Sequence, residues 1–337
     1  MVAKIIVMLI TLLNLTFTES IGEYYDQEKL TSLFSIPWGD EKGELSLRLK
    51  ELGPENYVWK VDFPIGVNAE GTRVIVGDKV KNQIYQFDIG GRLLLSIDLS
   101  GENKSQIIDL DFNSKGDIVV LRFYREKPAE NGMIQTFNRI GRLIKEFKVP
   151  IPVDEDSVIF VDDDNNIFVR QRNAPNFPHI AKLDENGRLI GSFKGAYKLM
   201  NSVVTLDGKI FTLYNNTLYT VDEMSNLKAV KYSVFLSKEK EEVFRPIGSD
   251  REGNLYFASY YRRYPQYGVL HITKLNFLGK VLFSKTIDIL PEQYRGRRLA
   301  LIGSSHWSGA YIDVDRNGNI YFIKPTSQGA EFWKLFN

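Results

Sequence analysis

Short hydrophobic runs separated by polar turns recur along the chain. Several segments share nearly the same order of positions, with a Gly or Asn between two hydrophobic runs. They read FNSKGDIVV (112–120), VDDDNNIFV (161–169), SDREGNLYF (249–257) and VDRNGNIYF (314–322). Gly and Asn accept the positive φ angle that a tight turn between strands requires. The pattern therefore predicts a β-hairpin in each segment.

Each predicted hairpin is followed by a second one at a similar offset. The second hairpins read NQIYQFDIGGRLLLSIDL (82–99), GMIQTFNRIGRLIKEF (132–147), PHIAKLDENGRLIGSF (178–193), NTLYTVDEMSNLKAVKY (216–232) and VLHITKLNFLGKVLFS (269–284). The first turns centre on Gly71, Gly116, Asn165, Gly208, Gly253 and Gly318. Four strands in a period of about 40 to 50 residues are typical of a β-propeller.

The last repeat, from residue 314 to the end, supplies only three strands. Near the N-terminus, DEKGELSLRL (40–49) matches the turn and fourth strand of an earlier repeat, DENGRLIGSF (184–193). An N-terminal strand would complete the last blade and leave no open sheet edge. We therefore predict an all-β, six-bladed β-propeller with four-stranded blades. Two packed β-sandwiches would also space their strands regularly, but they would not explain the incomplete last repeat.

The segments IPWGDEKGELSLRL (36–49) and VNAEGTRVIVGDKVKNQIYQFDIGGRLLLSIDL (67–99) resemble the NHL-like six-bladed propellers of exported bacterial proteins. The resemblance covers about residues 36–337. Its motifs are structural, so it implies the fold and not an activity.

The N-terminal residues have the layout of a signal peptide. Lys4 precedes an apolar run at 5–13, and small polar residues follow it. A transmembrane helix needs about 20 apolar residues, whereas Thr11 interrupts this run and Asn14 ends it. We predict a signal peptide at 1–20, a lead-in at 21–39 and the propeller at 40–337. A buried first helix or an uncleaved membrane anchor is the alternative.

Net charge and cysteine content limit the classes of binding partner that the sequence predicts. Lys and Arg number 43 against 42 Asp and Glu, so net charge favours neither nucleic acid nor an acidic membrane surface. The chain has no cysteine and therefore no disulfide or lipidated Cys. We expect an extracytoplasmic monomer, periplasmic or secreted, that contacts a membrane only if the signal segment is retained.

Long connections between second and third strands, and between blades, should lie on one face of the ring, the long-loop face. They are rich in Arg and aromatic residues, at 122–132, 170–178, 258–268 and 290–309. Arg provides a planar set of donors for anions, and aromatic rings stack on sugars or peptides. The candidate ligand-binding residues are Arg122, Arg170, Arg172, Tyr260, Tyr261, Arg262, Arg263, Tyr264, Arg297, His306 and Trp307. Alternatively, these amphipathic side chains only cover the loops.

The opposite face carries the short turns and is rich in acids. They are Asp162, Asp163, Asp164, Asp184, Glu185, Asp222, Glu223, Asp250 and Glu252. Asp forms turns readily, and we expect most of these acids to be solvated turn residues.

The sequence contains no specific catalytic motif. His179 and His271 fall in predicted third strands, away from the axis, so a zinc site with His306 is not expected. Asp111 and Asp313 lie on or beside inner strands, where polar residues commonly hydrogen-bond around a wet channel. No phosphate-binding glycine loop or nucleophile elbow is present.

The sequence supports three hypotheses. The first is an exported, non-catalytic propeller without a cofactor that binds a protein, peptide or anionic glycan on its long-loop face. The second is a metal-dependent hydrolase or lyase at the channel mouth. The third is RNA binding through stacking and basic residues, against which export argues, so we do not expect nucleic acid as a partner.

Overall fold

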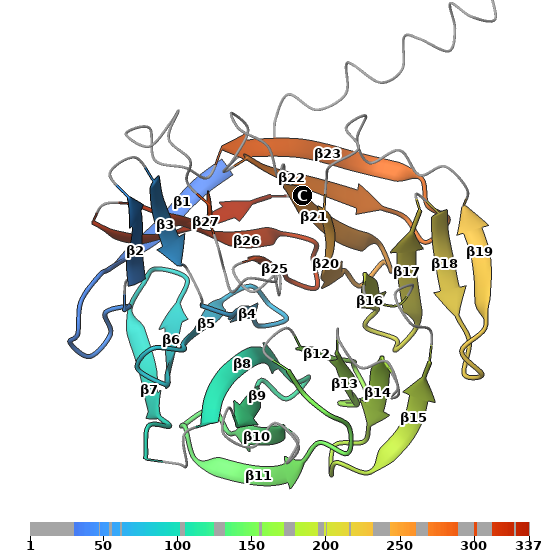
Figure 1. Ribbon diagram of the computed structural model, residues 1–337, viewed down its shortest axis with the longest axis horizontal. Helices are drawn as coiled ribbons and strands as arrows, with labels where there is room; N and C mark the ends of the chain where they lie inside the picture. The colour runs from blue at the N-terminus through green and yellow to red at the C-terminus, as the bar shows by residue number, and fades with distance from the viewer. Residues whose placement is uncertain are drawn as a thin grey trace, which may run out of the picture.

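The computed structural model describes residues 30–336, apart from 47, 54–55, 61–62, 102–104, 125–131, 155–156, 172–178, 195–198, 200, 216, 232–242, 261–268, 289–299, 302–311 and 327. Every regular element in this part is a β-strand. Six four-stranded antiparallel sheets are arranged in a ring (Figure 1). The predicted six-bladed propeller is confirmed.

The first three blades follow one another along the chain. Blade 1 consists of β4 (Ile65–Val67), β5 (Arg73–Asp78), β6 (Gln83–Asp88) and β7 (Leu93–Asp98). Blade 2 consists of β8 (Ser105–Phe112), β9 (Ile118–Tyr124), β10 (Met133–Phe137) and β11 (Leu143–Lys148). Blade 3 consists of β12 (Val158–Val161), β13 (Ile167–Arg170), β14 (Ile180–Leu183) and β15 (Leu189–Phe193).

The last three blades complete the ring. Blade 4 consists of β16 (Ser202–Val204), β17 (Ile210–Tyr214), β18 (Thr217–Val221) and β19 (Leu227–Lys231). Blade 5 consists of β20 (Val243–Ser249), β21 (Leu255–Tyr260), β22 (Val269–Leu275) and β23 (Val281–Asp288). Blade 6 consists of β25 (Ile312–Val314), β26 (Ile320–Pro325), β27 (Gly329–Leu335) and β1 (Leu30–Pro37).

An N-terminal strand does close the ring, but it is not the predicted one. Strand β1 pairs with β27, from Leu30 opposite Leu335 to Pro37 opposite Gly329. The prediction of 40–49 was wrong because β1 makes the contacts with β27: Ile36 is 2% exposed, and the ring of Phe34 stacks on Phe332 with centroids 4.6 Å apart. The matched glycine, Gly43, does form a turn with φ of 90°.

A small additional sheet lies outside the six blades. It contains β2 (Arg48–Gly53), β3 (Asn56–Lys60) and β24 (Ala300–Leu301), in that order. Strand β24 pairs in parallel with β3. The hairpin comes from the connection between blades 6 and 1, and β24 comes from the connection between blades 5 and 6. The repeat pattern did not predict this sheet.

The turns follow the predicted chemistry. All six glycine or asparagine residues at the first turns have positive φ, for example 64° at both Gly71 and Asn165. The acid that opens such a turn accepts backbone hydrogen bonds, as Asp250 Oδ1 does from the N–H groups of Glu252 and Asn254. Asp162, Asp184 and Asp222 act in the same way. For these acids the turn-forming role is confirmed, but Asp162 and Asp250 are buried and not solvated as predicted.

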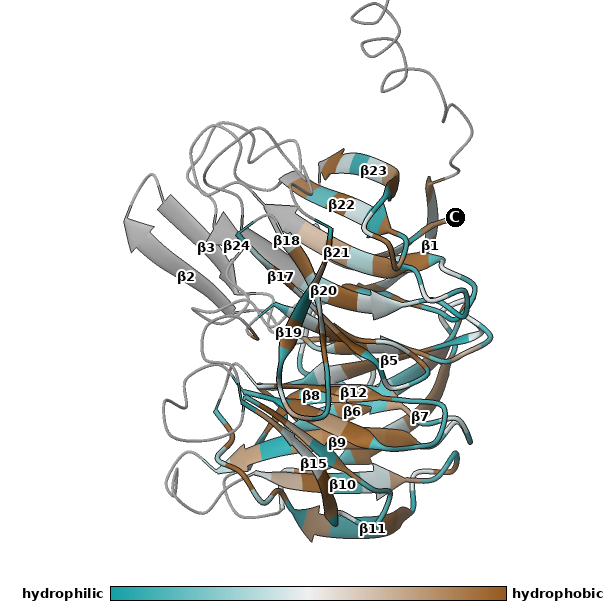
Figure 2. Ribbon diagram, turned by 90° about the vertical axis from the view of Figure 1, so that its right-hand side faces the viewer, coloured by the Kyte–Doolittle hydropathy of each residue, from teal (hydrophilic) through white to brown (hydrophobic). Residues whose placement is uncertain are grey.

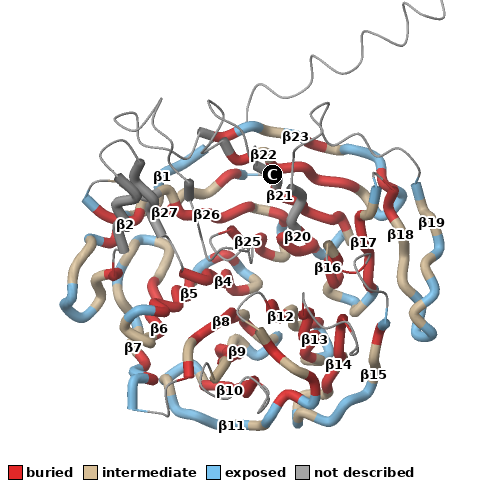
Figure 3. Tube along the Cα trace, viewed as in Figure 1, coloured by how far each residue is buried: buried red, intermediate tan, exposed pale blue. Residues whose placement is uncertain are grey.

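The core lies between adjacent blades. Inner and middle strands are buried, whereas the outermost strands are partly or fully exposed (Figure 3). In side view, hydrophobic residues occupy the strands and hydrophilic residues gather at the described turns (Figure 2). Within the described residues, no helix has the length and apolar character needed to cross a membrane.

Candidate functional site

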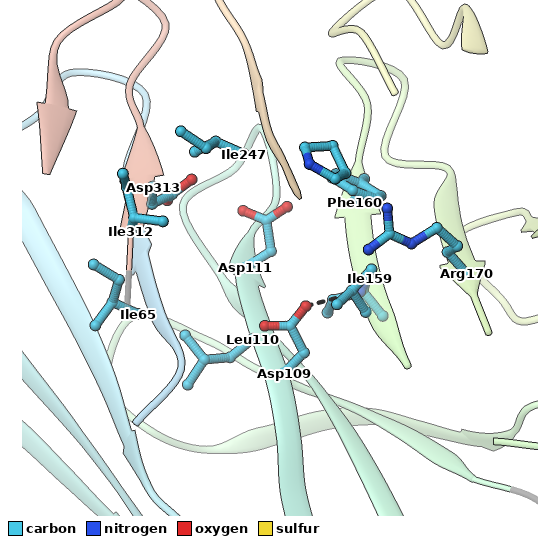
Figure 4. Close-up of a pocket in the computed structure, with 12 residues that line it drawn as sticks. Ile65, Asp109, Leu110, Asp111, Ile159, Phe160, Arg170, Ile247, Ile312 and Asp313 are labelled. Atoms are coloured by element: carbon cyan, nitrogen blue, oxygen red, sulfur yellow. Dashed lines mark hydrogen bonds between the residues drawn. The ribbon is translucent and has the colours of Figure 1, made fainter. Parts of the chain in front are cut away.

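Three carboxyl groups converge inside the ring. Asp109 and Asp111 project from β8, and Asp313 projects from β25 (Figure 4). Side chains two residues apart on a strand point to the same face, which is why both acids of β8 face the axis. We call Asp109, Asp111 and Asp313 the channel carboxyls.

Each channel carboxyl accepts a hydrogen bond from the backbone of the next blade. Asp109 Oδ2 accepts from Ile159 N at 2.9 Å, and Asp111 Oδ2 accepts from Val161 N at 3.0 Å. Asp313 Oδ2 accepts from Val67 N at 2.7 Å. These bonds join the inner strands of blades 2 and 3 and of blades 6 and 1. The carboxyls therefore help to hold the ring together.

Burial makes ionisation of these groups unfavourable. It raises the pKa of Asp109 and of Asp111 to about 7, although hydrogen bonds from backbone N–H groups partly oppose the shift. Burial and the neighbouring Asp111 carboxylate raise the pKa of Asp313 well above its ordinary value. Near neutral pH the three groups therefore share fewer than three negative charges.

The space beside the channel carboxyls is small. One cavity of about 50 Å³ is lined by all three, and a second of about 70 Å³ is lined by Asp111 and Asp313. Phe160 and Ile247 line both. Small-molecule sites usually have about 300 to 1,000 Å³, so these cavities suit a few water molecules and not a substrate.

Arg170 lies at this interior site and not in an exposed loop. It is the last residue of β13, is 5% exposed and lines the smaller cavity with Asp109 (Figure 4). Its Nη1 donates to Ser202 O at 2.8 Å, and its guanidinium lies 5.7 Å from the centroid of the Phe160 ring. Its positive charge partly offsets the rise in the pKa of Asp109. The sequence pattern predicts this arginine on the long-loop face, whereas it is buried beside the interior cavity.

Arg122 is also interior, in contrast to the prediction of an exposed arginine. The residue is fully buried in β9. Its Nη1 donates to Gln135 Oε1 at 3.1 Å, and its Nη2 donates to Leu99 O at 3.1 Å and Ser105 O at 3.5 Å. The guanidinium thus binds the connection between blades 1 and 2, where a surface ligand does not reach it.

We expect Arg122→Ala to lower the free energy of unfolding by about 3 kcal/mol, because buried acceptors lose their donor and a cavity forms. Urea unfolding followed by circular dichroism measures this change. Arg188→Ala, at an exposed turn position, serves as the control. Equal stability of the two variants would contradict the structural role of Arg122.

The remaining candidates are mostly outside the described residues. Tyr260 ends β21, but Arg172, Tyr261, Arg262, Arg263, Tyr264, Arg297, His306 and Trp307 fall in segments that the structure does not describe. Their role on the long-loop face stays a prediction.

The two described histidines lie in different blades. His179 is buried next to β14, and burial lowers its pKa. His271 is on β22, where its ring nitrogens bond to the hydroxyls of Thr286 and Ser284. Among the described residues, no three His, Asp or Glu side chains are placed to hold a metal ion.

Asp109 is the site residue that sequence reasoning missed. The available signal was the alternation in IIDLDF (107–112), which places Asp109 and Asp111 on one face of an otherwise apolar inner strand. An acid at such a position needs a buried partner, and here the partner is the backbone of the next blade.

No protein-family model and no curated protein matches the sequence. Many solved structures are similar in fold. A member of the DUF4221 family from Bacteroides vulgatus is 11% identical, with a TM-score of 0.52, over 93% of this chain and 98% of that one. A gluconolactonase from Xanthomonas campestris is 10% identical, with a TM-score of 0.50, over 92% and 89%. A candidate exported protein from Bacteroides fragilis is 11% identical, with a TM-score of 0.49, over 93% and 97%. At these identities the similarity shows the fold alone.

Proposed function

We propose that the protein is an exported, non-catalytic, NHL-like propeller whose long-loop face binds a protein, a peptide or an anionic glycan. The additional sheet formed by β2, β3 and β24 carries this proposal. Both chain segments that form it are connections between blades, and such connections enter the inner strands from the long-loop face. No blade needs this sheet for closure, so it enlarges one face of the ring.

Sequence chemistry on the same face supports the proposal. Among the segments outside the described residues, 261–268 contains Arg262, Arg263 and Tyr264, and 289–299 contains Arg297. Arg and Tyr are enriched at the centres of binding surfaces because they combine apolar contact with hydrogen bonding. The N-terminal segment, with its signal-peptide layout, supports export.

The channel offers weaker support for a hydrolase or lyase. The channel carboxyls bond to backbone N–H groups of the next blade, and their cavities have about 50 and 70 Å³. A substrate would have to displace these bonds, which join the blades. The alternative enzyme would therefore need a site built from residues at the channel mouth, outside this cluster.

Binding can be tested by thermal shift with a panel of anionic glycans, peptides and divalent cations. A ligand at about 100 times its Kd should raise the melting temperature by roughly 5 °C. We expect a glycan or peptide to do so and Arg262→Ala/Arg263→Ala to lose the shift. The control is Arg92→Ala/Arg142→Ala, which removes two exposed arginines from the short-turn face.

Three outcomes would contradict the proposal. The first is that no glycan or peptide stabilises the protein. The second is that the control variant loses the shift as completely as Arg262→Ala/Arg263→Ala does. The third is stabilisation by calcium or zinc alone, unchanged in both variants, which would favour the metal-dependent enzyme.

A further inference from the structure

A large hollow opens between blades 4 and 5 on the short-turn face, opposite the proposed binding face. Its volume is about 680 Å³, within the usual range for small-molecule sites. Its apolar lining residues are Leu206, Phe211, Ala229, Val230, Phe277 and Leu278. Phe211 lies on β17, Ala229 and Val230 lie on β19, and Phe277 and Leu278 form the turn between β22 and β23.

At this hollow, blade 4 lacks a lysine that blades 3, 5 and 6 have, whereas blades 1 and 2 carry Gln86 and Thr136 at the same position. In blades 3, 5 and 6, an aromatic residue of the second strand pairs with a lysine of the third, and the lysine Nζ lies 5.1 to 5.4 Å from the ring centroid. The pairs are Phe168 with Lys182, Tyr256 with Lys274 and Tyr321 with Lys334. In blade 4, Phe211 pairs with Thr220. The shorter side chain leaves this part of the blade interface unfilled.

The turn glycines show the same difference. A Cβ on Gly208 would contact Asp162, Lys182 and Phe168 of the preceding blade, and one on Gly71 would contact Asp315 and Tyr321. A Cβ on Gly253, which follows blade 4, would meet no atom within 4 Å. The first turn of blade 5 therefore faces open space where the corresponding turns of blades 1 and 4 are covered.

The outer strand of blade 4 leaves a cation unpaired beside this hollow. In blade 2, Lys145 lies opposite Thr136, and its Nζ binds Glu185 Oε1 at 3.3 Å and Asn186 Oδ1 at 3.2 Å in the next blade. Lys228 has the corresponding place opposite Thr220. Lys228 faces the second turn of blade 5, where Phe277 and Leu278 are 53% and 58% exposed. These two residues occupy the positions that Glu185 and Asn186 have in the second turn of blade 3.

The remaining charges around the hollow favour an anion. Asp163 pairs with Arg316, Asp207 Oδ2 lies 2.5 Å from Lys209 Nζ, and Asp250 Oδ2 lies 3.2 Å from Lys274 Nζ. Within the described part of the chain, the exposed side chains of Lys228 and Arg251 form no ion pair. Glu252, the fourth acid of the lining, forms no ion pair within the described residues and accepts a hydrogen bond from Asn254 Nδ2 at 3.1 Å. Two unpaired cations and one unpaired acid therefore border the apolar hollow, which leaves an excess of one positive charge.

We propose that this hollow is a binding site for an amphiphilic carboxylate, with an aliphatic body against Phe211, Phe277 and Leu278 and its carboxylate beside Lys228. The apolar body takes the place of the missing lysine stem, and the carboxylate takes the place of Glu185 in blade 3. Such a ligand supplies the packing that lysine stems give in blades 3, 5 and 6 and the ion pair that Lys145 and Glu185 form between blades 2 and 3.

Calorimetric titration of the whole protein with decanoate, below its self-association concentration, tests the site. Decanol and decylamine have the same chain and a neutral or cationic head. We expect decanoate to bind at least tenfold more tightly than either. Two variants should each lower decanoate affinity at least tenfold: Thr220→Lys, which fills the hollow as in blade 3, and Phe277→Glu, which supplies Lys228 with a carboxylate.

Controls separate the site from general effects. Lys148→Ala removes an exposed lysine from blade 2 and should leave the affinity unchanged, whereas Lys228→Ala should abolish the preference for decanoate over decanol. Phe277 is half exposed, so Phe277→Glu should fold even if Thr220→Lys does not. The proposal is overturned if decanoate does not bind, if decylamine binds as tightly, or if Phe277→Glu retains full affinity.

Discussion

Replacing Ile36 by aspartate is expected to lower the free energy of unfolding by about 4 kcal/mol, because a carboxylate would be buried without a partner. Ile36 is 2% exposed on β1 and belongs to the core that joins blades 6 and 1. Loss of β1 would also expose the edge of β27 along its whole paired length. Urea unfolding followed by tryptophan fluorescence measures the change.

The matched control is Thr31→Asp on the same strand. Thr31 is exposed and lies opposite Lys334, so we expect a change of less than about 1 kcal/mol. If Ile36→Asp were no more destabilising than Thr31→Asp, β1 would not close the ring, and 40–49 would again be the candidate closing strand.

The second large effect is a loss of stability as the pH rises. A carboxyl whose folded pKa is raised keeps its proton in the folded state at pH values where the unfolded chain has lost it. This contribution to stability is fully present below about pH 4, near the pKa of the unfolded chain. It is lost as the pH rises through about 7, the pKa of Asp109 and Asp111 in the folded state. The free energy of unfolding should therefore fall between pH 5 and pH 8.

Asp111→Asn should flatten this dependence, because asparagine does not ionise. The difference in free energy of unfolding between the variant and the wild type should be about 2 kcal/mol more favourable to the variant at pH 8 than at pH 5. This is less than the full shift would give, because part of the interval between the unfolded and the folded pKa of Asp111 lies below pH 5. Urea unfolding at several pH values measures the gain.

Asp222→Asn is the control for the pH experiment. Asp222 is an exposed turn residue whose pKa is lowered by hydrogen bonds from Asn226, and Asn occupies the same turn position at Asn138 and Asn276. Its stability contribution is lost only at acidic pH, so this variant should keep the wild-type slope between pH 5 and pH 8. An unchanged slope in Asp111→Asn would show that the channel carboxyls do not titrate in this range.

The fold could be predicted because its strongest determinants are local. Positive φ at Gly71 and Asn165 is required by turns only a few residues long, and the repeat places such turns once in every blade. The closing strand could not be identified in this way. The segment around Gly43 has the turn signal, but β1 is selected by the distant contacts of Phe34 and Ile36 with β27.

The candidate sites were less predictable because burial is not local. Arg122 reads as a loop cation in the sequence, yet carbonyl groups at Leu99 and Ser105 hold it inside. The hollow beside Phe211 lies where Thr220 stands in place of the lysine of blades 3, 5 and 6, and only comparison among the blades reveals this difference. Neither feature has a motif of its own.

Hydrogen exchange with mass spectrometry tests the proposed binding face most directly. The glycan or peptide that gives the largest thermal shift is added at saturation, and amide protection is compared with that of the free protein. We predict new protection in 125–131, 172–178, 261–268 and 289–299, with none in the short turns at 250–253 and 276–279. Protection confined to those turns, or its absence from all four long connections, would contradict binding on the long-loop face.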